Sequence, residues 1–95
     1  MRRASRIDAN HVEIVAALRH IGCSVQSLAT IGKGCPDLMV ALRGRTACLE
    51  IKDGQKPVSA QRLTPDEVLW IRKWRGEVHV VSSVREALQV IEGWR

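Results

Sequence analysis

The sequence contains neither phenylalanine nor tyrosine, so its aromatic side chains are three tryptophans, Trp70, Trp74 and Trp94. No apolar run reaches the length of a membrane span, and the arginine-rich start lacks the apolar stretch of a signal peptide. The sequence also lacks repeats, low-complexity tracts and domain linkers. We therefore expect one globular domain over residues 1–95, with no membrane partner.

Cysteine is too sparse to cross-link the fold. Cys23, Cys35 and Cys48 are odd in number and form no CxxC pair, and the histidines are scattered, so neither a disulfide framework nor a zinc site is indicated. The sequence instead predicts reduced, mostly buried thiols in a cytosolic protein. Cys48 is expected on the same strand face as Glu50, with packing as its main role.

The chain is basic, with eleven arginines, four lysines and a formal net charge of +5. The planar guanidinium of arginine makes bidentate contacts with phosphate, so this balance fits a nucleic-acid partner without establishing one. Arg2, Arg3 and Arg6 crowd the start of the chain. Two interpretations of residues 1–7 stay open: a flexible, solubilising basic tail, or an arm that contacts the phosphate backbone.

Hydrophobic periodicity predicts the elements in the first half of the chain. Apolar residues recur at helical spacing from about Asp8 to Ile21, which predicts a helix that Gly22 ends. Alternation over Ser24–Ile31 predicts a first strand. Two further apolar runs, within residues 34–42 and 48–52, are separated by a short turn and predict a β-hairpin.

Helix and strand signals alternate in the second half. Residues 53–61 are polar and predict a loop, and Thr64-Pro65 then predicts a capped helix that runs to about Arg75. Residues 78–81 predict a short buried strand, and a last helix follows a serine cap over residues 84–91. The expected fold class is α/β, a central mixed sheet flanked by helices in the order α-β-β-β-α-β-α.

The hairpin register brings two carboxylates together. If residues 43–44 form the turn, Leu42 pairs with Arg45, and counting back along both strands puts Asp37 opposite Glu50. Facing residues in an antiparallel pair project to the same side, roughly 5 Å apart at Cβ. Two carboxylates that face each other repel, so this pair costs stability unless a cation lies between them.

Lys52 lies two residues beyond Glu50 and shares its side of the strand. Two carboxylates with an adjacent ammonium are suited to the metal-assisted hydrolysis of a phosphodiester. The alternative is two solvated carboxylates and a surface lysine paired with Asp53. Aspartate is disfavoured in strands, and the register makes Asp37 face Glu50, so the site interpretation is favoured.

These residues carry a family resemblance. Pro36-Asp37 followed by Glu50-Ile51-Lys52 resembles the PD-(D/E)XK nuclease motif at every position. The runs at residues 32–37 and 63–70 resemble those of the small stand-alone VRR-NUC nucleases, which are often phage-borne. The resemblance extends from about Asp8 to about Ile91, nearly the whole chain.

The resemblance implies a restriction-endonuclease-like fold and a Mg²⁺-dependent DNA endonuclease, with Mn²⁺ able to substitute and no small-molecule cofactor. It implies that Asp37, Glu50 and the backbone carbonyl of Ile51 hold the metal. Lys52 would orient or help activate the attacking water and offset charge that develops on the phosphate. It also implies action in the cytoplasm of a bacterial host, where the protein would be phage-encoded.

Acidic residues outside the motif leave alternatives open. Relatives place an extra acidic metal ligand on the first helix, where Glu13 lies, but Glu13 could equally form a capping box with Asn10. Asp8 is the rival acid, although it is expected to cap the helix. Glu67 departs from the family, because many relatives carry glutamine there.

Polar residues around the hairpin are candidates for DNA contact. Lys33 lies in a Gly-x-Gly loop before the first carboxylate, where glycine lets the backbone approach a phosphate. Gln55, Lys56 and Arg62 follow the strand that carries Glu50. A plain flexible turn and a solvated polar loop are the respective alternatives.

Trp70 and Trp74 lie one helical turn apart, on one face, and are candidates for a dimer interface. A two-fold homodimer would supply the paired cuts that resolve branched DNA such as a four-way (Holliday) junction. Three alternatives remain: a monomeric nickase without junction preference, a non-catalytic nucleic-acid-binding protein, and a structural partner of a larger phage or host assembly.

Overall fold

The computed structural model describes residues 9–94, so the predicted basic tail and the prediction for Asp8 lie outside the described residues. The helices and strands follow the predicted order, with one 3-10 turn added in the segment expected to be a loop. In chain order the elements are α1 (Ala9–His20), β1 (Ser24–Ser27), β2 (Leu38–Leu42), β3 (Arg45–Ile51), η1 (Val58–Gln61), α2 (Pro65–Lys73), β4 (Val78–Val81) and α3 (Val84–Glu92).

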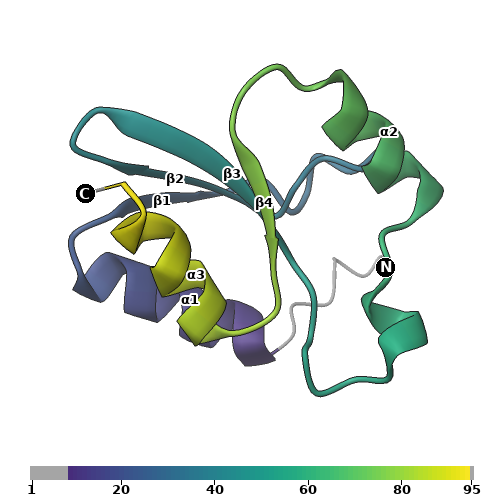
Figure 1. Cartoon of the computed structure of the whole chain (residues 1–95), viewed down its shortest axis with the longest axis horizontal. Helices are drawn as coiled ribbons and strands as arrows, with labels where there is room; N and C mark the ends of the chain where they lie inside the picture. The colour runs from purple at the N-terminus through teal and green to yellow at the C-terminus, as the bar shows by residue number, and fades with distance from the viewer. Residues whose placement is uncertain (1–8, 95) are drawn as a thin grey trace.

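The four strands form one mixed sheet in the order β1-β2-β3-β4 (Figure 1). β1, β2 and β3 are antiparallel neighbours, whereas β4 runs parallel to β3. A parallel neighbour requires a crossover connection, and the segment that holds η1 and α2 provides it. The predicted mixed sheet is therefore confirmed.

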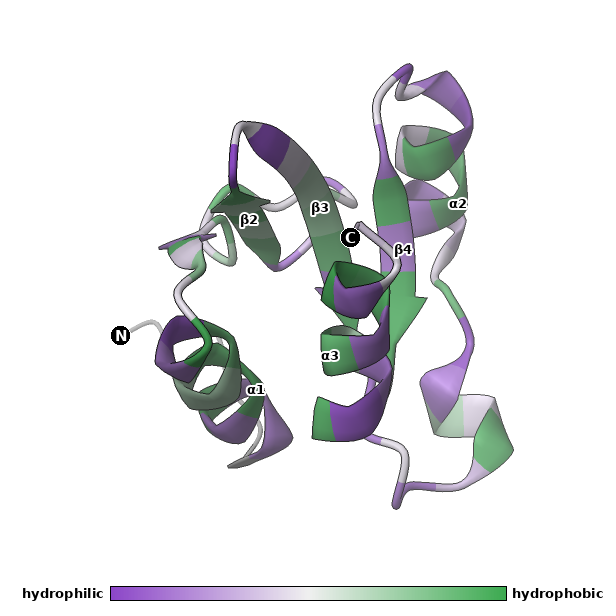
Figure 2. Ribbon diagram, turned by 60° about the vertical axis from the view of Figure 1, so that its left-hand side comes forward, coloured by the Kyte–Doolittle hydropathy of each residue, from purple (hydrophilic) through white to green (hydrophobic). Residues whose placement is uncertain are grey.

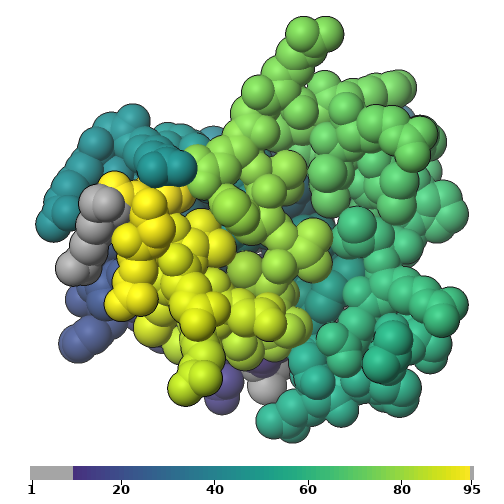
Figure 3. All heavy atoms as spheres, in the orientation of Figure 1, coloured from purple at the N-terminus to yellow at the C-terminus, as the bar shows by residue number. Residues whose placement is uncertain are grey.

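Helices α1 and α3 lie side by side against one face of the sheet, and the apolar core lies between them and the strands (Figures 1 and 2). Helix α2 stands apart from this pair, in a lobe beside β4 (Figure 3), and it has no buried residue. No helix among residues 9–94 is long and apolar enough to cross a bilayer. The buried cluster comprises Ile14, Leu18, Cys23, Leu38, Val40, Leu49, Ile51, Val81, Ala87 and Ile91.

The predicted hairpin register is confirmed. Leu42 pairs with Arg45, and the ladder runs back to Leu38 opposite Leu49. Arg43 and Gly44 both have positive φ, at 54° and 81°, which is the backbone of a type I′ turn. This two-residue turn matches the twist of the strands and fixes the register. One step past the last pair, Asp37 stands opposite Glu50.

Two predicted boundaries were too long. β1 ends at Ser27 instead of Ile31: the N–H of Leu28 still donates to the carbonyl of Asp37 in the register of the ladder, but the chain then turns, with the N–H of Ile31 donating to the carbonyl of Leu28. α2 ends at Lys73, since Trp74 leaves the helix with an extended backbone. Both ends are set by local backbone bonding that apolar spacing does not reveal.

Candidate active site

Asp37 sits at the entrance to β2, where the loop of residues 28–36 joins the sheet. Its carboxylate Oδ2 accepts a 2.8 Å hydrogen bond from the backbone N–H of Ile51, across the hairpin. Pro36, which precedes it, is fully buried and restrains the approach of the loop. Asp37 is therefore held by β3, the strand that carries Glu50 and leads into Lys52.

Glu50 points away from the core, because its neighbours Leu49 and Ile51 belong to the buried cluster and side chains alternate along a strand. Its side chain is nevertheless buried, at 4% exposure. Burial, together with the charges of Asp37 and Glu67, raises the pKa of Glu50 to about 8, against the opposing effect of Lys52. The repulsion predicted for facing carboxylates is thus present in the folded chain.

Lys52 lies on the same side as Glu50 and is held between two carboxylates. Its Nζ is 3.6 Å from Oε2 of Glu50 and 2.8 Å from Oε1 of Glu67. Burial alone would lower the pKa of Lys52, but the hydrogen bond to Glu67 and the two negative charges outweigh burial and raise it. The side chain is therefore a fixed ammonium, not a mobile surface lysine paired with Asp53.

Glu67 reaches this cluster from the first turn of α2. Its N–H is capped by the Thr64 hydroxyl, and its own Oε1 accepts the backbone N–H of Thr64 at 2.8 Å, which completes a capping box. Burial raises the pKa of Glu67, but the hydrogen bond to Lys52 and the capping bond overcome burial and lower it. The cap at Thr64 was predicted from the sequence, whereas the contact of Glu67 with Lys52 was not.

Helix α2 is held against the site by a glycine. Gly34 has a φ of 84°, and a Cβ added there would collide with the backbone carbonyl of Asp66. The loop that leads into Asp37 therefore lies directly against the N-terminus of α2. Any larger residue at position 34 would separate the helix that carries Glu67 from the hairpin.

Two thiols border the carboxylates. Burial raises the pKa of Cys48, which lies on the Glu50 side of β3, and burial together with Asp37 and Glu50 raises the pKa of Cys35. All three cysteines are free, and Cys23 and Cys48 are buried, as predicted. Protonated thiols are poor nucleophiles and poor metal ligands, so their role here is packing.

The donor atoms of the site fit a hard divalent cation. Asp37 and Glu50 offer carboxylate oxygens. The N–H of Ile51 points toward β2, where it bonds Asp37, and the carbonyl of Ile51 points the same way, since both groups of a strand residue face the same side. All three are oxygen donors of the kind that Mg²⁺ and Mn²⁺ prefer. Within residues 9–94, no group of three or more His, Cys, Asp and Glu side chains is arranged around one metal position.

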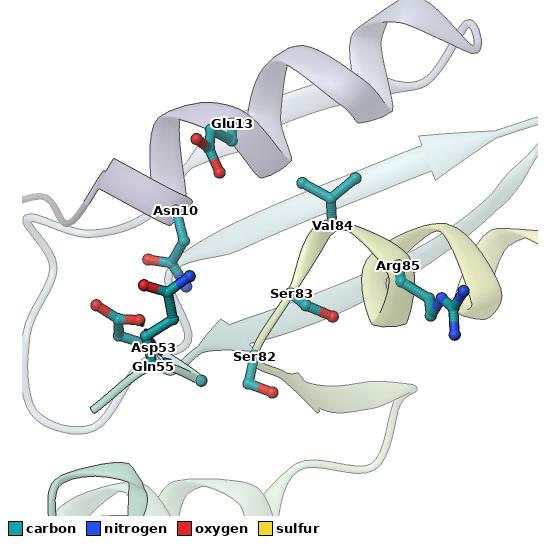
Figure 4. A pocket seen from close by; sticks show the side chains of 9 residues that line it. Asn10, Glu13, Asp53, Gln55, Ser82, Ser83, Val84 and Arg85 are labelled. Carbon is teal, nitrogen blue, oxygen red and sulfur yellow. Dashed lines mark hydrogen bonds between the residues drawn. The ribbon is translucent and has the colours of Figure 1, made fainter. Parts of the chain in front are cut away.

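Glu13 lines a cavity of about 590 Å³, together with Asp53 and Gln55 from the segment that follows Lys52. Figure 4 shows Glu13 on α1 facing this cavity, opposite the segment that carries Asp53 and Gln55. The capping box with Asn10 is not formed, because Asn10 lies within α1 and its side chain donates to the carbonyl of Lys52 at 2.9 Å. Glu13 as a metal ligand stays a prediction.

The candidate DNA-contact residues lie on exposed loops around the site. Lys33 is exposed in the loop beside α2, with a positive φ of 56°, and it lies between two glycines that also have positive φ. Gln55, Lys56 and Arg62 are exposed in the segment between β3 and α2, and Gln55 also lines the cavity of Glu13. DNA contact by these residues stays a prediction.

Trp70 and Trp74 stack on each other, with ring centroids 4.6 Å apart and planes at 22°. Trp74 is 46% exposed, so the pair is not enclosed by the fold. Val68 and Leu69 are exposed on the same helix. α2 thus presents apolar surface that the described residues leave uncovered, and a dimer interface there stays a prediction.

Comparison with known proteins adds a structural relative. Neither a scan against protein-family models nor a search of curated proteins found a match. Among solved structures, a chain described as a VRR_NUC domain matches with a TM-score of 0.60 and 28% sequence identity. The match covers 93% of this chain and 100% of that chain. The likeness therefore extends over nearly the whole domain and is not confined to one motif.

Proposed function

Since this chain is a VRR-NUC domain, we propose that it is a Mg²⁺-dependent DNA endonuclease that hydrolyses phosphodiester bonds by attack of water. Its fold is the restriction-endonuclease-like fold that the sequence led us to expect. The observation that carries the proposal is the convergence of Asp37, Glu50 and Lys52 at the open end of the β2–β3 hairpin.

In this proposal Asp37, Glu50 and the carbonyl of Ile51 hold the cation. A bound Mg²⁺ or Mn²⁺ would polarise the phosphate and make bound water more acidic. The ammonium of Lys52 donates a hydrogen bond to the attacking water or to a phosphate oxygen and offsets the negative charge that develops there. Holding a cation would need both Asp37 and Glu50 ionised, so the proton that burial favours on Glu50 would have to leave to solvent.

DNA is the expected partner, because the chain carries a net charge of +5 and the loops beside the site hold exposed basic residues. We expect Lys33, Lys56 and Arg62, with Gln55, to contact backbone phosphates. Such contacts position DNA but do not read sequence. We therefore expect recognition by DNA structure, such as a branch, and not by base sequence.

A homodimer is part of the proposal, because one domain holds one site and a four-way junction needs two symmetric cuts. α2 offers the surface for it. The helix has Asp66 in its first turn, Arg72 and Lys73 in its last turn and the exposed Val68 and Leu69 between them, and the exposed Trp74 follows its last residue. Two copies of α2 packed antiparallel about a two-fold axis would place opposite charges together over the apolar centre.

Cleavage of matched linear, flap, splayed and four-way-junction DNA tests the function. We expect products with Mg²⁺ or Mn²⁺, loss of cleavage in EDTA, and no cleavage by Glu50→Ala or Lys52→Ala proteins that remain folded. Retained cleavage by both variants would refute the assignment. Salt-sensitive binding without a metal-dependent product would instead support a non-catalytic DNA-binding protein.

Light scattering tests the dimer. We expect twice the chain mass at micromolar concentration, and a shift toward one chain mass in Trp74→Ser. Val58→Ser is the matched control, because Val58 is an exposed apolar residue (73%) on η1, outside the proposed interface. A single-chain mass for the unaltered protein would refute the dimer, and equal cutting of linear duplex and junction would refute the branch preference.

A further inference from the structure

Glu67 is bound to the site more tightly than its place in the sequence suggests. Its Oε1 lies 2.8 Å from Nζ of Lys52, whereas Oε2 of Glu50 lies 3.6 Å from the same nitrogen. The shorter contact of Lys52 is therefore with Glu67 on α2, and not with Glu50 on β3, the strand that leads into Lys52. Both partners are largely enclosed, with side-chain exposures of 13% for Lys52 and 16% for Glu67. A contact this enclosed is screened much less by solvent than a surface ion pair.

The same oxygen of Glu67 has a second partner. Oε1 also accepts the backbone N–H of Thr64 at 2.8 Å, so one atom joins the first turn of α2 to the ammonium of Lys52. The carboxylate is therefore fixed by the backbone of its own helix, not by a flexible neighbour. A lysine side chain has four rotatable bonds, and a rigid acceptor at its end selects one arrangement from many.

We propose that Glu67 is a positioning residue for the cleavage reaction: its fixed carboxylate oxygen holds the Lys52 ammonium beside the Asp37–Glu50 pair. This inference rests on the proposed nuclease function. When Asp37 and Glu50 are engaged by a cation, Glu67 is the remaining acceptor that keeps Lys52 in place. The hydrogen-bond acceptor at position 67 carries this role, so glutamine should largely replace glutamate, whereas alanine should not.

Helix α3 supplies a matched control. Glu86 occupies the same helix position in α3 as Glu67 does in α2. Its N–H is capped by the hydroxyl of Ser83, and its Oε1 accepts the N–H of Ser82 at 2.7 Å. Glu86 has no lysine partner among the described residues. Glu86→Ala therefore removes a comparable cap without touching Lys52.

Two measurements test the proposal. In steady-state cleavage, Glu67→Ala should lower kcat about 10- to 100-fold with KM changed less than about 3-fold, since displacement of a positioned group acts on the chemical step. The kcat of Glu67→Gln should stay within about 5-fold of that of the unaltered protein, and the kcat of Glu86→Ala should equal that of the unaltered protein. Thermal unfolding of each variant checks that the protein remains folded.

The second measurement does not depend on cleavage. Acetylation of lysines at fixed pH, mapped by mass spectrometry, reports how firmly Lys52 is held, with the exposed Lys33 as internal reference. We expect the Lys52 rate, relative to Lys33, to rise about 10-fold in Glu67→Ala and to stay unchanged in Glu86→Ala. Unchanged Lys52 reactivity in Glu67→Ala would overturn the proposal, as would equal losses of kcat in Glu67→Gln and Glu67→Ala.

Failure of the proposed function has a different signature. A folded, unaltered protein that cleaves no DNA with Mg²⁺ or Mn²⁺ would refute the nuclease, whatever the variants do. A cleaving protein whose Glu67→Ala variant keeps both kcat and Lys52 reactivity would refute only the role of Glu67.

Discussion

The buried carboxylate of Glu50 makes stability depend on pH in a way that one substitution isolates. The pKa of Glu50 is raised from 4.5 to about 8, so the folded chain holds this proton to higher pH than the unfolded chain does. The stabilising effect is therefore complete below pH 4.5 and is lost as pH rises toward about 8. Glu50→Gln removes the ionisation and keeps an amide that can still donate a hydrogen bond to Glu67.

The size of the effect follows from the displacement of the pKa. Each pKa unit corresponds to about 1.4 kcal/mol, so a displacement of this size amounts to about 5 kcal/mol over the full range and about 3 kcal/mol between pH 6 and pH 9. For a domain of this length, about 3 kcal/mol lowers Tm by more than about 10 °C. Over the same pH range, Glu50→Gln should lose only the stability that the other titrating groups contribute.

Chemical and thermal unfolding in EDTA at pH 6, 7.5 and 9 measures this difference. Relative to the difference between the two proteins below pH 4.5, the glutamine variant should gain about 2 kcal/mol over the unaltered protein at pH 6 and about 5 kcal/mol at pH 9. Burial raises the pKa of Cys23 and Cys48 in both proteins, so the contribution of these two thiols cancels in the comparison. If the two stability curves run parallel from pH 6 to pH 9, then Glu50 is not buried beside Asp37 and Glu67 as described.

Three further predictions concern other parts of the molecule. Mn²⁺ at pH 8 should raise the Tm of the unaltered protein but not of Asp37→Ala, because the variant lacks a cation ligand; equal shifts in a thermal scan would contradict the site. Glu77→Gln should cost about 1 kcal/mol of stability in urea unfolding at pH 7, because Glu77 bonds Arg45. It should leave cleavage unchanged, because this contact lies at the far end of the sheet from the site. Since the pKa of Glu77 is lowered to about 2, the stability cost should fade as pH drops from 4.5 toward 2. Gly34→Ala should destabilise by more than about 1 kcal/mol and expose Lys52 to acetylation, because a Cβ would strike the carbonyl of Asp66; an unchanged Tm would show that α2 does not rest on the loop.

Local rules were sufficient to predict the hairpin and its carboxylate pair. A two-residue turn at Arg43-Gly44 permits one register, and the period of two along a strand then decides which side chains share a face. Asp37 opposite Glu50, with Lys52 on the same side as Glu50, is a consequence of counting. The order of elements was predictable for the same reason, since caps, glycines and apolar periods are local signals.

Tertiary structure alone decided what surrounds that pair. The cap at Thr64 was predicted from the sequence, but the contact of Glu67 with Lys52 depends on the crossover that brings the first turn of α2 to the open end of the hairpin. The burial of Glu50, and with it the raised pKa, likewise comes from segments far away along the chain. Sequence spacing placed Glu13 on the first helix but could not show that it lines a cavity with Asp53 and Gln55. Contacts between distant segments depend on how helices pack on the sheet, and no local period encodes that geometry.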